Sequence, residues 1–140
     1  MAVTDFDTKV GVVVRDDLAT WQRLNVTAFL VSGLIAGASD EVVGPPYEDA
    51  DGVTYLPMLR QPVLVFEASG QKLKTIHERA LTRELDFAIY TAELFVTGHD
   101  DDNRAAVKAV PTADLDLVGI AIRAPHKLAD GVLRGLKRHP

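Results

Sequence analysis

The sequence predicts a three-layer α/β/α domain built on a four-stranded mixed sheet. Runs of β-branched residues alternate with helical patterns, in the order strand, helix, strand, helix, strand, strand, helix. The 140 residues are 47% hydrophobic and 25% charged, which is ordinary for one globular domain. No repeat, low-complexity tract or linker interrupts the chain, so we expect a single domain over residues 1–140.

The first predicted strand is followed by a nearly uncharged helix. The β-branched run at 10–15 reads as a buried strand, and Thr20 is a good N-cap for a helix that ends near Ser39. No charged residue occurs at 24–39, so the helix must be covered on more than one side. The uncharged run has 16 residues and contains polar side chains, which makes it too short and too polar to cross a membrane.

Small residues in this helix allow close approach of another backbone. The residues are Ser32, Gly33, Ala36 and Gly37. Two interpretations stay open: the helix packs only on its own sheet, or it also contacts a helix of a second subunit. The second interpretation predicts a homodimer.

A long connection over residues 40–61 follows the helix. Its Asp51-Gly52 pair lies between Tyr47 and Tyr55 and is typical of a hairpin turn. The next strand is expected at 62–68, followed by a helix that Ser69 caps and that ends near Leu85. The core-facing side chains expected on this second helix are Leu73, Ile76, Ala80 and Leu81.

The last third of the chain is expected to complete the sheet. A short strand at 87–90 precedes an irregular stretch at 91–113, with a helical turn at 103–107. A fourth strand at 115–122 leads to a helix that begins near Pro125 and carries Leu128, Val132 and Leu136. Right-handed crossovers would make most of the sheet parallel, whereas the third and fourth strands, which lack a long intervening helix, are expected to pair antiparallel.

Composition excludes several classes of function. There is no cysteine, which removes disulfides, thiolate metal sites and cysteine nucleophiles. The net charge of −5 disfavours nucleic-acid binding, which needs clustered lysine and arginine. The N-terminal residues carry no secretory signal pattern, so a cytoplasmic location is expected.

No cofactor or metal is expected. The first strand and helix are not joined by a glycine-rich loop, and Asp16 and Asp17 at the start of that helix favour its dipole and repel phosphate. The histidines have no ligand spacing, and residues 48–52 resemble only a fragment of a calcium loop.

A family resemblance rests on several motifs. The strand end and helix start at 13–18, the strands at 63–66 and 87–90, and residues 118–121 before a closing helix resemble the type II peptidyl-tRNA hydrolase fold. Segments 17–25, 47–52, 103–107 and 136–140 are similar to a bacterial family of unknown function within that superfamily. The resemblance covers nearly the whole chain and implies a type II peptidyl-tRNA hydrolase-like fold.

The hydrolase residues implied by this resemblance are mostly missing. The hydrolases carry a lysine directly after the Asp-Leu pair, where this chain has Ala19. Their acidic residue after the third strand corresponds loosely to Glu93, the one catalytic candidate. A shared fold does not transfer function when the site residues differ.

A ligand site is expected at the carboxyl ends of the parallel strands, where open α/β sheets collect ligands. An aromatic wall, an amide and charged groups there would suit a small polar ligand. The candidate residues are Arg15, Asp17, Trp21, Asn25, Tyr90, Asn103 and Arg104.

Three functions follow as hypotheses. The first is a small-ligand-binding domain that lacks the hydrolase lysine. The second is a hydrolase of an ester or amide, such as a peptidyl-tRNA-like substrate, in which Glu93 activates water and Arg104 or Asn25 holds the oxyanion. The third is a structural homodimer module.

Overall fold

The computed structural model describes residues 7–39 and 41–138; Asp40, the opening residues 1–6 and the last two residues of the closing motif lie outside the described residues. The elements in chain order are β1 (Thr8–Arg15), α1 (Thr20–Gly37), β2 (Tyr47–Glu48), β3 (Thr54–Tyr55), β4 (Val63–Ala68), α2 (Gly70–Thr82), β5 (Phe87–Thr91), the 3-10 helix η1 (Ala92–Phe95), α3 (Asp100–Lys108), the 3-10 helix η2 (Thr112–Asp114), β6 (Leu117–Pro125), α4 (His126–Val132) and β7 (Lys137–Arg138).

The central sheet is mixed and has the strand order β5-β6-β1-β4-β7. It has five strands rather than the predicted four, because the two residues of β7 pair with β4 and are too few to give a periodic signal. The antiparallel pairing of β5 with β6 is confirmed. The expectation of a mostly parallel sheet is wrong: among the described strands only β1 and β4 pair in parallel, since β6 enters between β1 and β5 in the opposite direction.

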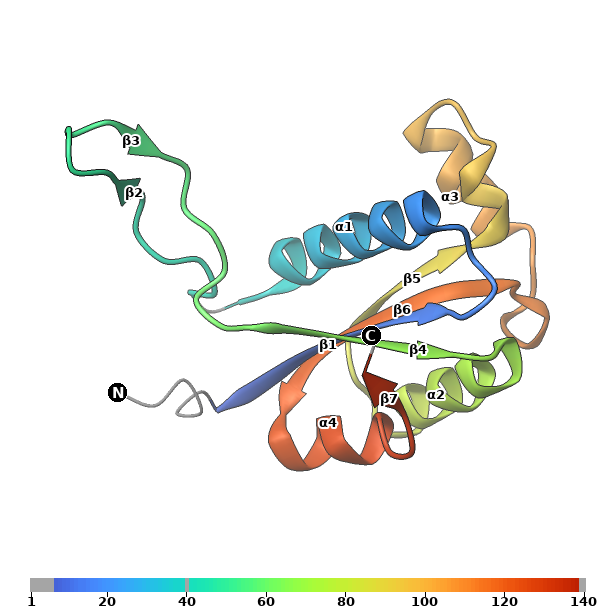
Figure 1. The fold of residues 1–140 in the computed structure, drawn as a ribbon. Helices are drawn as coiled ribbons and strands as arrows, with labels where there is room; N and C mark the ends of the chain where they lie inside the picture. Colours follow the sequence, from blue (N-terminus) through green and yellow to red (C-terminus); the bar gives the residue numbers. More distant parts are fainter. Residues whose placement is uncertain (1–6, 40, 139–140) are drawn as a thin grey trace.

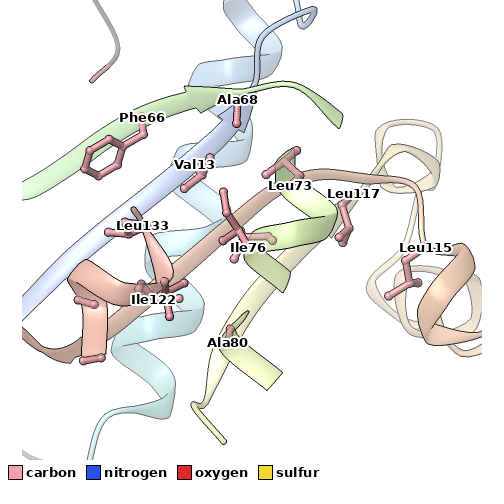
Figure 2. Close-up of a cluster of buried hydrophobic side chains, with 14 residues drawn as sticks. Val13, Phe66, Ala68, Leu73, Ile76, Ala80, Leu115, Leu117, Ile122 and Leu133 are labelled. Atoms are coloured by element: carbon pink, nitrogen blue, oxygen red, sulfur yellow. The ribbon is translucent and has the colours of Figure 1, made fainter. Parts of the chain in front are cut away.

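Helices cover both faces of this sheet. α1 lies on one face, and α2 and α4 lie on the other (Figure 1). Successive side chains of β1 point to opposite faces of the sheet and so contribute to the core on both faces. Val12 and Val14 pack beneath α1, whereas Val13 joins the cluster beneath α2 and α4 (Figure 2). The coarse prediction of an α/β fold with helices on both faces of a mixed sheet is confirmed.

The helix α1 is less buried than its sequence suggests. Only Val26 and Leu30 are buried, whereas Trp21 and Leu24 are exposed. The N-cap residue is Ala19 rather than Thr20, and the Gln22 side chain accepts a hydrogen bond from the Ala19 N–H at 2.9 Å. Asp16 and Asp17, which were expected at the start of this helix, precede the N-cap residue and lie outside its first turn. No helix within the described residues is long and apolar enough to span a membrane.

The remaining helices follow the predictions in part. Ser69 caps α2 as expected, with its hydroxyl accepting from Lys72 N at 3.1 Å, but Leu81 is 47% exposed rather than buried. The segment expected to be irregular contains η1, α3 and η2. α4 ends at Val132, so Leu136 lies beyond it.

The predicted hairpin is confirmed and forms a projecting arm. We define the arm as residues 42–60, with β2 and β3 at its tip. Figure 1 shows it extending away from the sheet on the same side as α1.

Candidate functional site

The carboxyl ends of β1 and β5 lie at the same edge of the sheet. Both strands run antiparallel to β6, which separates them. In the pairing register, Val14 of β1 and Tyr90 of β5 lie opposite the same residue, Gly119 of β6. Arg15 and Tyr90 thus lie at the edge where the sequence predicts the site, and one strand, β6, runs between the strands that carry them.

A groove lies beside α1 at this edge. Its volume is about 740 Å³, and its walls come from α1, β5, η1, α3 and the loop that leads into α3. Five of the predicted ligand residues line it: Trp21, Asn25, Tyr90, Asn103 and Arg104. On α1 the lining residues include positions 21, 25, 29 and 33, which are spaced by one helical turn and share one face.

The polar centre of the groove is a pair of side chains. Asn25 Nδ2 donates a hydrogen bond to Tyr90 Oη at 3.3 Å. This bond leaves the Tyr90 O–H free to donate and the Asn25 carbonyl oxygen free to accept. Burial raises the pKa of Tyr90 above 10.0, against a smaller opposing effect of Asn25, so the phenol keeps its proton at neutral pH.

Aromatic rings form the apolar wall around this pair. Tyr90 lies against Phe95 with ring centroids 5.1 Å apart and against Phe29 at 5.9 Å. Trp21 contacts the edge of Phe95 at 5.8 Å and is 61% exposed at the groove. These rings give the groove an aromatic lining, and each exposed ring face could pack against a flat ligand.

The outer rim of the groove is charge-balanced. Arg104 forms ion pairs with Asp100 and, at 3.9 Å, with Asp101. The hydrogen bond to Asp100 raises the pKa of Arg104, and both partners lie at the exposed start of α3. Asn103 accepts a hydrogen bond from Thr97, which fixes the loop before α3. The rim therefore offers hydrogen bonds rather than a strong net charge.

Two predicted ligand residues, Arg15 and Asp17, do not line the groove. Arg15 Nε bonds Asp17 Oδ1 at 2.6 Å, and Arg15 Nη1 bonds Asp116 Oδ1 at 2.9 Å. Burial lowers the pKa of Arg15, but these two carboxylates raise it by more. Arg15 has the same strand parity as Val13, so it lies on the face opposite α1, where it ties the end of β1 to the start of β6.

Glu93 lies in η1 next to the groove and is not one of its lining residues. Its Oε2 atom is buried, and it has no hydrogen-bond partner within the described part of the chain. Thr91 Oγ1, two residues earlier, is in the same condition. Asn25 and Arg104, the two groups considered for holding the oxyanion, line the groove, whereas Glu93 does not.

Several groove residues were missed from the sequence. Phe29 could have been found, because it follows Trp21 and Asn25 at intervals of four on α1. Phe95, Thr97 and His99 carry no sequence signal that distinguishes them from loop residues, and only the fold brings them to the groove.

No group of three or more histidine or acidic side chains within the described residues could hold a metal ion. In the segment that resembles a calcium loop, Asp49 bonds the hairpin turn instead: its Oδ1 accepts from Asp51 N and Val53 N, each at 3.0 Å.

The sequence matches, over residues 8–140, the model of a family described as a protein of unknown function (DUF2000). The chain belongs to the DUF2000 family. No curated protein matches it.

A solved structure is closely similar to this DUF2000 chain. It is a protein of unknown function, Atu0240, from Agrobacterium tumefaciens strain C58, with 43% sequence identity and a TM-score of 0.93. The similarity covers 96% of this chain and 99% of the other. Because the family and this relative have no described function, a function for the DUF2000 chain must be argued from its own groove and surfaces.

Proposed function

We propose that the chain is a small-ligand-binding domain whose ligand occupies the groove beside α1. The observation that carries the proposal is the Asn25–Tyr90 pair, a half-buried donor and acceptor set within aromatic rings. The volume of about 740 Å³ lies within the usual range of small-molecule sites.

The chemistry of this pair favours a ligand with an adjacent N–H and C=O. A ligand carbonyl would accept from the Tyr90 hydroxyl, and a ligand N–H would donate to the Asn25 carbonyl oxygen. The ring wall of Trp21, Phe29 and Phe95 favours a flat ligand. We infer a planar, uncharged or weakly charged amide-containing ring, because Arg104 is already neutralised by Asp100.

Trp21 is the single tryptophan of the chain, so its fluorescence reports directly on the groove. Uracil, which carries adjacent N–H and C=O groups, is expected to give saturable quenching. 1,3-Dimethyluracil has the same ring without N–H donors and is expected to bind about fivefold more weakly, the factor for one net hydrogen bond of about 1 kcal/mol. No saturable response to either probe, with no thermal shift in a wider screen of small polar metabolites, would reject the proposal.

Two tyrosine variants distinguish an effect on binding in the groove from an effect elsewhere in the molecule. Tyr90→Phe removes the donor of the groove and is expected to weaken uracil binding by a similar factor. Tyr55→Phe removes a hydroxyl on the arm and should leave uracil binding unchanged. Equal effects of the two variants would show that the hydroxyl of Tyr90 has no specific role.

Hydrolysis of an ester or amide, including a peptidyl-tRNA-like substrate, is the alternative that we rank second. Its support is the Oε2 atom of Glu93, which is buried and has no hydrogen-bond partner among the described residues, although a buried carboxylate oxygen normally has one. Against it, Ala19 stands where the resemblance to the hydrolases implies a lysine, and it is the N-cap residue of α1. Ester or peptidyl-tRNA cleavage that disappears in Glu93→Gln would reverse this ranking.

We further propose kinship with the type II peptidyl-tRNA hydrolase superfamily in fold rather than in activity. Support comes from the motif resemblance together with the mixed α/β architecture. A bacterial origin is supported by the source of the similar structure, and a cytoplasmic location by the absence of cysteine. We also propose that the domain forms a homodimer, because the uncharged α1 keeps much of its surface exposed.

A further inference from the structure

The arm is an ordered ribbon that has no core of its own. At its base Arg60 N bonds Val42 O and Gly44 N bonds Met58 O, both at 3.0 Å. At its tip β2 pairs with β3, and Asp49 bonds the turn through backbone and side chain. Residues 45–56 are all exposed.

The arm carries large apolar side chains into solvent. Tyr47, Val53, Tyr55, Leu56 and Met58 expose between 50% and 86% of their area. An isolated two-stranded hairpin is marginally stable in water and needs a further surface to pack on. The arm therefore has the character of an element that packs on another molecule.

A second unpartnered apolar surface lies on the same side of the sheet. α1 packs on β5, β6 and β1, and it reaches β4 through an ion pair of Arg23 Nη1 with Glu67 Oε2 at 3.2 Å. A groove of about 510 Å³ remains between α1 and β4; its lining is mostly apolar and includes Leu24, Ala28 and Val65, together with Arg23. This flank of α1 is opposite the flank that bears Asn25, so it is distinct from the ligand groove.

We infer that the occupant of both surfaces is a second copy of this chain, with each arm lying across α1 and β4 of its partner. The arm and α1 lie on the same side of the sheet (Figure 1), and the α1–β4 groove is lined by residues of this helix. In a dimer with twofold symmetry, the arm of each chain packs on the α1–β4 groove of the other chain. One interface therefore covers both arms and both grooves. The exposed part of α1 carries no charge after Arg23, as expected for the core of an interface.

The exposed area is sufficient for a stable dimer. The arm residues together with Leu24 and Ile35 make seven large side chains, exposed by 38% to 86%. At roughly 150–250 Å² for a fully exposed aromatic side chain, and less for an aliphatic one, they present at most on the order of 800 Å² per chain. About 800 Å² per partner is the standard size of a specific interface.

The inference rests on the proposed homodimer and is independent of the ligand. Light scattering with size exclusion is expected to give twice the chain mass for the wild type, and a monomer for both Leu24→Glu and Leu56→Glu. Leu81→Glu, on exposed α2 surface of the opposite face, is the matched control and should stay dimeric. A monomeric wild type overturns the dimer. A dimer that survives both α1 and arm substitutions overturns this surface and leaves the homodimer standing.

Cross-linking adds a positive readout in this cysteine-free chain. A Leu24→Cys chain and a tagged Leu56→Cys chain, mixed and treated with a short bis-maleimide, are expected to give the mixed cross-linked species. A Leu81→Cys chain in place of Leu24→Cys should give none; equal yields in both mixtures overturn the inference. Uracil quenching measured on the same samples reports separately on the ligand proposal, so either proposal can fail alone.

Discussion

Val26 of α1 lies directly against Gly119 of β6. A Cβ atom at position 119 would come within 2.5 Å of Val26 Cγ1 and within 2.9 Å of Leu30 Cδ1. Gly119 also pairs with both Val14 and Tyr90 across the sheet, so this contact sets the height of α1 above the strand ends that form the groove. The shape of the groove thus depends on a glycine within a strand.

Gly119→Val should therefore destabilise the fold and widen the groove. Displacing two buried side chains of α1 is expected to cost about 1–3 kcal/mol in the free energy of unfolding. Urea denaturation followed by circular dichroism measures this cost. The control is Gly37→Ala at the end of α1, where an added Cβ meets nothing within 4 Å and should cost no stability. Equal stability of Gly119→Val and wild type would contradict the packing described here.

The pH dependence of stability tests the environment of His77. This side chain is buried in α2 and packs edge-to-face on Phe87 at 5.5 Å. Burial lowers its pKa below 6.5, opposed in part by Glu78. The neutral ring is favoured in the folded state, so stability is complete above the unfolded-state pKa and is lost as the pH falls through the lower folded-state pKa.

Replacing His77 by leucine should remove this acid sensitivity. Melting temperatures measured from about pH 7.5 to about pH 5 are expected to fall less in His77→Leu than in the wild type. The same slope in both proteins would show that His77 does not take up a proton in that range on unfolding.

The tip of the arm should depend on Asp49. Its carboxylate accepts hydrogen bonds from Asp51 N, Val53 N and the Tyr55 hydroxyl, and the Tyr55 bond is the largest cause that lowers its pKa below 3.8. The stabilising effect is present above that value and is lost as the pH falls through the lowered pKa. Asp49→Ala is expected to speed hydrogen exchange at the Asp51 and Val53 amides, without changing the melting temperature of the domain. Glu48→Ala is the control, and equal exchange rates in the two variants would contradict the assignment.

Local patterns in the sequence predicted much of the fold. The β-branched run of β1 and the capping residue Ser69 mark their elements because strand burial and helix capping depend on nearby residues. The two-residue strand β7 and the exposed face of α1 were missed, because both depend on contacts between distant segments. The exposure of Leu81 was missed for the same reason. Helical spacing identifies which face of α2 is apolar, but it does not show how much of that face the sheet covers.

The candidate site was predicted in part for a similar reason. Strand order brought the ends of β1 and β5 to one edge, and five of the predicted ligand residues line one groove. Arg15 was misplaced although strand parity could have excluded it: Val12 and Val14 face α1, so Arg15 faces away. Phe95 and His99 reach the groove through the turns of η1 and the following loop, which no pattern in the sequence specifies.

The most direct test of the ligand groove is a titration of the isotopically labelled protein with uracil, followed by amide and side-chain NMR shifts. We expect the largest shifts at the Trp21 indole N–H and the Asn25 side-chain amide, with smaller shifts on β5, and 1,3-dimethyluracil should move Trp21 more than Asn25. Shifts confined to the arm or to α2 and α4, or none that saturate, would contradict binding in the groove.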